Sequence, residues 1–442
     1  MLFDRYGSFV GGIDLPDEKH ATISRAIEPY RPVDLVRVPL SPCGDRAAET
    51  VVEPGERVLA GQRIAVSSGS RSVDIFASVS GKVISMTTAQ LAVADAFETM
   101  PAIEIAPDGK SGPAPAEQLG LDWRAASAVE LRRRIKDGGL TTCRRPVEAL
   151  SGWIDRARSK CCRTLIANAM EGQPFVTASH RLLVDCAEEV ISGLAILGRA
   201  MEAKALAIAV DRRRTDDYSS IVQQADAHNI APVALPHKYP TGADAMLVKV
   251  LTRRERPPGG SVMDVGVAVV DPATCSAVYR CVVGQTMPTG RVVTVSGPRS
   301  SRTGNFFVPF GVNCLELVGQ DTQPVVQNGP MVGIRCSPEA VVGPATDSVL
   351  ALEASVPVPA SPCIRCSWCT DHCPARLNVA ALNDAFELSD LRRARKLVAT
   401  ACVECGVCSY VCPARLPLSE RVRQLKRAVT SIKQAMPLYE GN

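Results

Sequence analysis

The chain has 442 residues, of which 46% are hydrophobic and 22% are charged, so its composition is that of a globular protein with a large core. Its formal net charge of +4 is too small to indicate binding of nucleic acid, and we expect no nucleic-acid partner. At roughly 100–200 residues per domain, the length predicts about three domains.

The start of the chain and its apolar segments give an expectation about location. The N-terminal stretch MLFDRYGSFVGGIDLPDEKH lacks the basic start and apolar core of a signal peptide. No apolar run reaches the roughly 18 residues that a membrane-spanning helix needs. We therefore expect an intracellular protein with no direct membrane span, which associates with a membrane, if at all, through partners.

Residues 33–90 alternate apolar and polar residues between Gly and Pro turns, as in VEPGERVLAGQRIAV and DIFASVSGKVISM. This alternation is typical of half-buried strands. Two short halves of this kind predict a small β-sandwich or barrel, and nothing in them has catalytic character.

Residues 125–250 alternate short apolar runs with helical patterns. The runs are TLIANAM, ALAIAVDR and IAPVALP, and the clearest helical segment is RLLVDCAEEVISGLAILGRAM. Strand and helix in alternation predict an α/β domain with a parallel sheet. Because ligands of such sheets bind at the carboxyl ends of the strands, the segment NAMEGQPF at residues 168–175 is a candidate for a binding edge.

Residues 262–345 are interpreted as strand-rich from the stretches MDVGVAVV, AVYRCVV, RVVTVSG and NFFVPFG. The sequence contains no P-loop, no G-x-S-x-G elbow and no H-E-x-x-H pair. Its five histidines are far apart along the chain. We therefore expect no hydrolase.

Eight of the seventeen cysteines form two matched sets near the end of the chain. Each set reads Cys-x2-Cys-x2-Cys-x3-Cys-Pro, and both end in CPARL. The sets are Cys363, Cys366, Cys369 and Cys373, followed by Cys402, Cys405, Cys408 and Cys412. Clustered cysteines in a reducing compartment indicate metal, and this spacing is the bacterial ferredoxin pattern for [4Fe–4S] clusters.

The fourth ligand of each cluster is expected to come from the opposite set, as in two-cluster ferredoxins. The first cluster is then predicted on Cys363, Cys366, Cys369 and Cys412, and the second cluster on Cys402, Cys405, Cys408 and Cys373. Zinc is the alternative, but structural zinc sites use paired Cys-x2-4-Cys elements, often with histidine. We expect Trp368 to pack over its cluster and limit water.

The segment LSERVRQLKRAVTSIKQAM after the second set predicts an amphipathic helix with Ser419 as its N-cap. From residue 361 to the end, 12 Lys and Arg stand against 7 Asp and Glu, a net charge of +5. The basic face of this helix is either an ordinary solvated surface or a contact for an acidic electron carrier.

Taken together, these segments resemble the family of the Rnf complex C subunit, which also includes the PduS cobalamin reductase of propanediol-utilisation microcompartments. The resemblance covers about residues 8–435. The matching segments are GGIDLPDEKHAT, VEPGERVLAGQRIA with SGKV, LPHKYPTGADAMLVKVLTRRERP, GRVVTVSG, GNFFVPFG, NGPMVG and the two cysteine sets.

The resemblance implies a multidomain α/β fold with four parts. A barrel-sandwich hybrid β domain covers residues 1–115, and an α/β domain like the flavin-bearing subunit of respiratory complex I covers 125–255. A β-grasp (SLBB-like) domain follows at 262–345, and a helical two-[4Fe–4S] ferredoxin-like domain at 355–442. It also implies FMN as a cofactor and NAD(H) as a possible substrate.

The flavin loop of this family usually reads Gly-Gly-Ala-Gly-Phe-Pro-Thr, and the matching stretch here is DGGLTTCRRP. Only Gly138 and Gly139 match. Glycines in such loops let backbone N–H groups approach phosphate closely, and Leu140, Thr141 and Thr142 would crowd that approach.

Two further flavin-side motifs are also altered. Asn-x-x-Glu-x-Glu-Pro is matched by Asn168 and Glu171, with Gln173 in place of the second glutamate. Asn-x-x-Thr is matched by Asp271 and Thr274, and a carboxylate there would repel a flavin phosphate. The resemblance thus assigns cofactor binding to Gly138, Gly139, Asn168, Glu171, Asp271 and Thr274. Two interpretations stay open, a modified pocket that still binds FMN and a flavin site that has decayed.

The function that the resemblance implies is electron transfer between NAD(H), FMN or a reduced carrier and a redox protein partner, through the two clusters. Expected partners are other Rnf subunits, ferredoxin or flavodoxin, or microcompartment enzymes. The expected location is cytoplasmic, inside a bacterial microcompartment or peripheral at the membrane. The altered glycine loop favours the PduS-like role. The alternative function is a flavin-free iron–sulfur relay or scaffold without NADH chemistry of its own.

Overall fold

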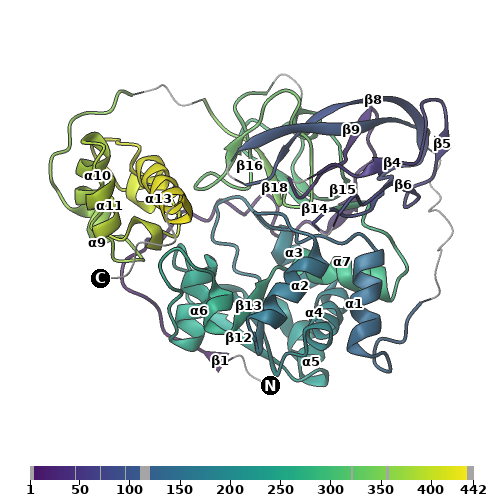
Figure 1. Ribbon diagram of the computed structural model, residues 1–442, viewed down its shortest axis with the longest axis horizontal. Helices are drawn as coiled ribbons and strands as arrows, with labels where there is room; N and C mark the ends of the chain where they lie inside the picture. Colours follow the sequence, from purple (N-terminus) through teal and green to yellow (C-terminus); the bar gives the residue numbers. More distant parts are fainter. Residues whose placement is uncertain are drawn as a thin grey trace.

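The computed structural model describes residues 4–44, 46–69, 71–94, 96–109, 120–319, 322–354 and 358–435, and of residues 4, 5 and 432–435 it describes the backbone alone. Parts of the predicted domains at 1–115 and 355–442 therefore lie outside the described residues. Figure 1 shows a β-rich part at the upper right, an α/β part below it and a helical module at the left.

The N-terminal β part is built from two small sheets, whose core continues into residues 293–351. The longest strands, β8 (Gly81–Ala92) and β9 (Phe97–Pro107), pair antiparallel in a four-stranded sheet of order β3-β9-β8-β5. The other strands are β3 (Val36–Pro39), β4 (Glu49–Thr50), β5 (Arg57–Val58), β6 (Arg63–Val66) and β7 (Ile75–Phe76). Alternate residues of these strands are buried together, which confirms the predicted small sandwich or barrel.

The α/β part has a parallel sheet of order β1-β12-β11-β10-β13. Its strands are β1 (Asp4–Arg5), β10 (Thr164–Asn168), β11 (Ala205–Asp211), β12 (Ile230–Leu235) and β13 (Val267–Val270). The three apolar runs predicted as strands form β10, β11 and β12, and the predicted parallel sheet is confirmed.

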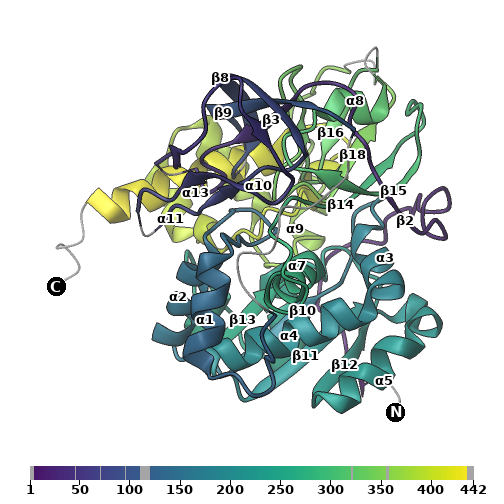
Figure 2. The ribbon, with the colours of Figure 1, turned by 90° about the vertical axis from the view of Figure 1, so that its right-hand side faces the viewer.

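Helices pack on both faces of this sheet: α6 shares a core with one face, and α1, α2, α3, α4, α5 and α7 share a core with the other. In Figure 2, α1 and α2 lie at the left of the unit and α3 and α5 at the right. The helices are α1 (Ala128–Asp137), α2 (Leu150–Ser159), α3 (Ala178–Asp185), α4 (Ala187–Met201), α5 (Ser219–Ala227), α6 (Asp244–Thr252) and α7 (Pro272–Val282). Short 3-10 helices cover Arg212–Tyr218 (η1) and Val262–Val265 (η2). Helix α4 is almost entirely buried and packs closely on α7, since a Cβ at Gly193 would lie only 1.9 Å from the Cys275 carbonyl oxygen.

Two features of this sheet differ from the sequence-based expectation. Strand β13 pairs with β10, so the sheet crosses the predicted domain boundary between residues 255 and 262. The stretch AVYRCVV was expected to be a strand but forms the end of helix α7. Its β-branched and aromatic residues favour a strand, but Asp271 caps the helix and Pro272 occupies its first position, both of which favour helix initiation.

A six-stranded mixed sheet follows, in the order β17-β16-β18-β14-β15-β2. Its strands are β2 (Ile27–Pro29), β14 (Gly290–Ser296), β15 (Gly304–Pro309), β16 (Val325–Gln327), β17 (Ile334–Arg335) and β18 (Ser348–Ala351), and the short helix α8 spans Cys314–Val318. The predicted strands RVVTVSG and NFFVPFG form the antiparallel pair β14 and β15. Strand β2 comes from the predicted N-terminal domain, so the start of the chain joins other units. The β-grasp assignment stays a prediction.

The helical module contains the two cysteine sets at equivalent places. Its helices are α9 (Trp368–Asp371), α10 (Val379–Glu387), α11 (Leu391–Lys396), η3 (Ala399–Ala401), α12 (Val407–Tyr410) and α13 (Leu418–Ala435). The apolar face of α13, including Val422, Leu425 and Val429, is buried in the core of the module. Helix α13 begins at Leu418, one residue before the predicted N-cap Ser419.

None of the helices in the described part of the chain combines the length and apolarity that crossing a bilayer requires.

Candidate functional site

The four thiols that are predicted to bind the first cluster come from both cysteine sets and lie together. Cys363, Cys366 and Cys369 line one small cavity together with Cys412, the last cysteine of the other set. Ala380 of α10 completes part of the wall. This grouping is the one that an exchanged fourth ligand requires.

Cys373 lies within electrostatic range of the second set. Burial raises the pKa of Cys402, Cys405 and Cys408, and repulsion from Cys373 raises each of these pKa values further. A backbone N–H from Leu377 donates to the Cys373 Sγ at 3.4 Å. Because metal ligation needs thiolates, the raised values mean that binding of iron would release protons here.

Among the residues that the structure describes, no group of three or more His, Cys, Asp or Glu side chains is arranged to hold a single metal ion. A cubane cluster is larger than one ion and binds each thiolate through a different iron atom. Its four ligands therefore stand further apart than those of a single ion. Each of the two cysteine groups contains the four thiols that one cubane cluster would need.

The first cluster site lies at the surface of the module. Cys366 and Ile364 are exposed, and Ile364 is 64% exposed. Trp368 is 53% exposed and does not line the cavity of the four thiols, so its expected packing over the cluster is not observed. The next residue, Cys369, is the buried one.

A much larger cavity, of about 820 Å³, lies where the α/β part, the six-stranded sheet and the helical module meet. This volume falls within the roughly 300–1,000 Å³ of typical small-molecule sites. Its wall residues lie within the segments 142–156, 170–173, 239–245, 256–269 and 332–334, in the helical module and at Ala94. Cys402 and Cys405 of the second cluster line it directly, whereas the thiols of the first cluster line a separate cavity.

The charged lining of the large cavity is predominantly basic. The lining contains six cationic and three anionic side chains, a difference of +3. The cationic residues are Arg144, Arg145, Arg156, Arg256, Arg423 and Lys426, and the anionic residues are Glu148, Asp244 and Glu404. Arg144 pairs with Asp244 at 2.6 Å, and Arg145 donates to the carbonyl oxygens of Ala94 and Val332 at 3.0 and 2.9 Å. A cavity of this size and sign suits an anionic ligand such as a phosphate ester.

Gly138 and Gly139 end helix α1 outside the lining of this cavity. A Cβ at Gly138 would lie 2.3 Å from the Cys281 Sγ, and one at Gly139 would lie 2.4 Å from the Asp74 carbonyl oxygen. Gly139 also has a φ of +60°, which favours glycine. Close packing therefore accounts for both glycines, while Thr142 and the two arginines of the same loop reach the cavity.

Asn168 and Glu171 do not line the cavity but form hydrogen bonds that hold the segments next to its wall. The Asn168 Nδ2 donates to the Gly242 carbonyl oxygen at 2.8 Å, which ties the end of β10 to the loop before α6. The Glu171 carboxylate accepts from the backbone N–H groups of Ser179 and His180 at the start of α3. Burial raises the pKa of Glu171 to about 7. The neighbouring residues Met170, Gly172 and Gln173 do line the cavity.

Asp271 and Thr274 act together at the start of α7. The Asp271 carboxylate accepts from the Thr274 N–H at 2.9 Å and from the Thr274 hydroxyl at 2.7 Å. The same hydroxyl accepts from the Cys143 N–H at 2.8 Å, which fixes the loop that carries Arg144 and Arg145. The carboxylate that was expected to repel a phosphate is therefore engaged in a helix cap.

Sequence reasoning missed the polar groups that join the cavity to the second cluster. The Tyr239 hydroxyl donates to the Cys405 carbonyl oxygen at 2.7 Å, and the Gln173 Nε2 donates to the same hydroxyl at 3.4 Å. The Gln173 Oε1 accepts from the Met331 N–H at 3.0 Å. Gln173 was noted only as a departure from a motif, and the Arg-Arg-Pro that ends the glycine loop was the available signal for a basic cavity.

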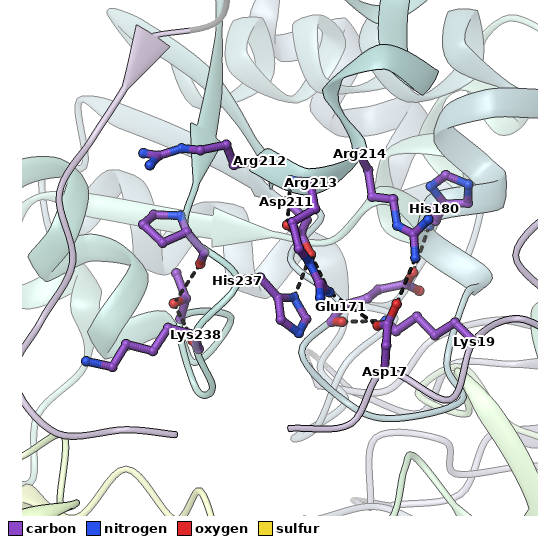
Figure 3. Close-up of polar contacts among 12 residues, drawn as sticks. Asp17, Lys19, Glu171, His180, Asp211, Arg212, Arg213, Arg214, His237 and Lys238 are labelled. Atoms are coloured by element: carbon purple, nitrogen blue, oxygen red, sulfur yellow. Dashed lines mark hydrogen bonds and ion pairs between the residues drawn. The ribbon is translucent and has the colours of Figure 1, made fainter. Parts of the chain in front are cut away.

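A second polar cluster holds the N-terminal segment over the edge of the sheet (Figure 3). Asp17 pairs with Arg213 and Arg214 of η1, and the His237 Nδ1 lies 2.6 Å from the Asp211 carboxylate. Burial opposes ionisation of Asp211, but hydrogen bonds from His237 and from the Arg213 N–H hold its pKa at about 2. These contacts fix the carboxyl end of β11.

Three known domain families match successive parts of the chain. The RnfC barrel sandwich hybrid domain matches residues 7–110, the Nuo51 FMN-binding domain matches 151–280, and the 4Fe-4S dicluster domain matches 362–416. The last range contains all eight cysteines of the two sets. The second range includes β13 and most of α7, in agreement with the sheet that crosses the predicted boundary.

Relatives that match most of the chain are C subunits of the ion-translocating oxidoreductase complex. The one from Salmonella arizonae is 31% identical over 389 residues, which are 85% of this chain and 57% of the relative. The one from Salmonella choleraesuis is 33% identical over 392 residues, which are 85% of this chain and 54% of the relative. The chain is thus similar over most of its length to C subunits of this complex. It spans a little over half the length of the curated relatives that it matches.

The three domain matches agree with a mixed α/β multidomain fold and with FMN and [4Fe–4S] clusters as cofactors. Among solved structures, the NAD+-reducing [NiFe]-hydrogenase in its H2-reduced state is similar with a TM-score of 0.45 and 16% identity, over 72% of this chain and 63% of that chain.

Proposed function

We propose that the chain transfers electrons between a nicotinamide or reduced carrier and a redox protein partner, through FMN in the large cavity and the two clusters. The observation that carries this proposal is the position of Cys402 and Cys405 in the wall of that cavity. The second cluster is then the one next to the flavin, and the first cluster, beside the exposed Cys366, is the one next to the partner.

The cavity supports retained FMN despite the altered glycine loop. Its volume of about 820 Å³ and its excess of basic side chains suit a flavin with a phosphate group. Arg144 and Arg145 follow the glycine pair, and they would bind phosphate through side chains where the family uses backbone N–H groups. FMN bound here would supply exchange between hydride and single-electron chemistry.

The surrounding residues of the chain would keep the two redox groups in place. Tyr239 fixes the Cys405 loop against the cavity, and Gln173 orients Tyr239. Burial raises the pKa of Tyr239 above its ordinary range, so its hydroxyl stays protonated as a donor. The Asp271–Thr274–Cys143 contacts hold the loop that brings Arg144 and Arg145 into the cavity wall.

The partner that the names of the relatives support is another subunit of an ion-translocating oxidoreductase complex, with this chain peripheral to the membrane. The PduS-like role in a microcompartment, with a corrinoid as acceptor, stays a prediction. The genes that neighbour the coding sequence would separate these two settings.

The test is the cofactor content and NADH response of anaerobically purified protein. We expect about eight irons per chain, binding of added FMN, and bleaching of the cluster absorbance by NADH only when FMN is present. Full iron content without flavin binding or NADH response would favour the flavin-free relay. That alternative draws support from the buried Leu140 and Thr141 in the altered loop.

A further inference from the structure

Two cationic side chains converge on the backbone of the second cluster at Cys402. The Arg256 Nη2 donates to the Cys402 carbonyl oxygen at 3.0 Å and to the Ala401 carbonyl oxygen at 3.2 Å. The Lys426 Nζ, from helix α13, donates to the same Cys402 oxygen at 3.0 Å. The two cations reach this carbonyl from different parts of the fold, one from the loop after α6 and one from the module itself.

The charge of Arg256 is not balanced locally. Its hydrogen bonds go to the carbonyl oxygens of Gly260, Ala401 and Cys402, and no carboxylate of the described ranges forms an ion pair with it. Lys426, in contrast, pairs with Glu404, and Glu404 also lies 3.4 Å from the Arg423 guanidinium. Glu404 is thus the acidic counterpart in a mainly basic group.

The surroundings of the first cluster differ. Arg365, next to Cys366, is 68% exposed at its side chain and pairs with Asp384 at 2.9 Å. A solvated pair of this kind contributes little net field. Cys402 and Cys405 are partly buried in the wall of the large cavity, where charges are screened less than at the surface.

Adding an electron to a cluster increases its negative charge, and nearby positive charge stabilises the reduced form. Net charge, hydrogen bonds and solvent exposure are the factors by which a protein sets the reduction potential of such clusters. We propose that Arg256 and Lys426 are positioning residues that raise the reduction potential of the second cluster above that of the first, and that Glu404 opposes them.

The inference rests on the proposed function in one respect, the binding of two clusters by the exchanged cysteine groups. It predicts which of the two clusters holds an electron more tightly. An electron that enters from the cavity is held at the second cluster, and a partner at the first cluster must draw it onward. NADH and FMN play no part in the measurement that follows, so the two proposals fail separately.

The experiment is a redox titration with dithionite, followed by EPR, of full-length protein with both clusters assembled. Cys366→Ser identifies the signal of the first cluster. Lys426→Met keeps the length of the side chain without its charge, and Arg256→Gln removes the second charge. Glu404→Gln removes the opposing carboxylate. Arg427→Met, at the adjacent and exposed position of α13, is the matched control.

We expect Lys426→Met and Arg256→Gln to shift the midpoint potential of the second cluster to more negative values and Glu404→Gln to shift it to more positive values. The first cluster and the Arg427→Met control should stay unchanged. Unshifted potentials, equal shifts of both clusters, or shifts of one sign in all three variants would overturn the proposal. If Arg256→Gln fails to assemble its clusters, the opposite signs expected for Lys426→Met and Glu404→Gln decide.

Discussion

At the scale of single residues, the last cysteine of each set is grouped with the first three cysteines of the other set. Cys412 lines the cavity of Cys363, Cys366 and Cys369, and Cys373 acts electrostatically on the second set. The exchange interlocks the two halves of the module, because each cluster would bind ligands from both sequence repeats. The loss of one terminal cysteine should therefore damage the cluster of the other set.

Replacement of these two cysteines tests the exchange. Cys373→Ala should abolish or alter the EPR signal of the second cluster and leave that of the first, and Cys412→Ala should do the reverse. Each variant is the control for the other, and Cys161→Ala, at an exposed cysteine outside both sets, should change neither. If Cys373→Ala altered only the first-cluster signal, the ligand assignment would be wrong.

Glu171 gives a prediction about pH. Burial raises its pKa from 4.5 to about 7, so the folded state holds the proton more tightly than the unfolded state. This contribution to the free energy of unfolding is present below about pH 4.5 and is lost as the pH rises through about 7.

Urea denaturation at several pH values measures this effect. Glu171→Gln carries no titrating group, so its stability relative to the unchanged protein should increase between pH 5 and pH 8. An equal difference at both pH values would show that Glu171 titrates normally. Because the carboxylate also caps α3, Ser179→Ala serves as a control variant at the same helix start that keeps the titrating group.

At the scale of elements, helix α7 shows how a short signal outweighs composition. Its sequence is rich in strand-forming residues, but Asp271 and Pro272 begin a helix that packs against α4. The cap does more than start the helix, because its hydrogen bonds continue through Thr274 to Cys143 in the arginine loop. The cavity wall and the helix start are therefore one hydrogen-bonded unit.

Asp271→Ala removes this cap and should lower the free energy of unfolding by about 1 kcal/mol. Asp271→Asn keeps an acceptor for the Thr274 N–H and should lose much less. Chemical denaturation of both variants checks the order. The same loss of stability in the two variants would show that the cap contributes little.

At the scale of the whole molecule, the predictable parts are those with a local period. The repeated cysteine spacing, the three apolar runs of the parallel sheet and the alternation of the N-terminal strands could all be predicted from neighbouring residues. The large cavity could not, because its walls join segments that are spread between residues 94 and 426. Tyr239 and Arg256 lie in the matching segment LPHKYPTGADAMLVKVLTRRERP, but the segment gave neither residue a role, and only folding brings them to the second cluster.

The second cluster borders the large cavity, and the first cluster lies beside the exposed Cys366. We propose that electrons pass from the cavity to the second cluster and then to the first. The most direct test adds NADH, under anaerobic conditions, to FMN-loaded protein that lacks one cluster and follows the other by EPR. In Cys412→Ala, NADH should still reduce the second cluster. In Cys373→Ala, the first cluster should be reduced by dithionite but not by NADH. Reduction of the first cluster by NADH in the absence of the second would contradict this order of electron transfer.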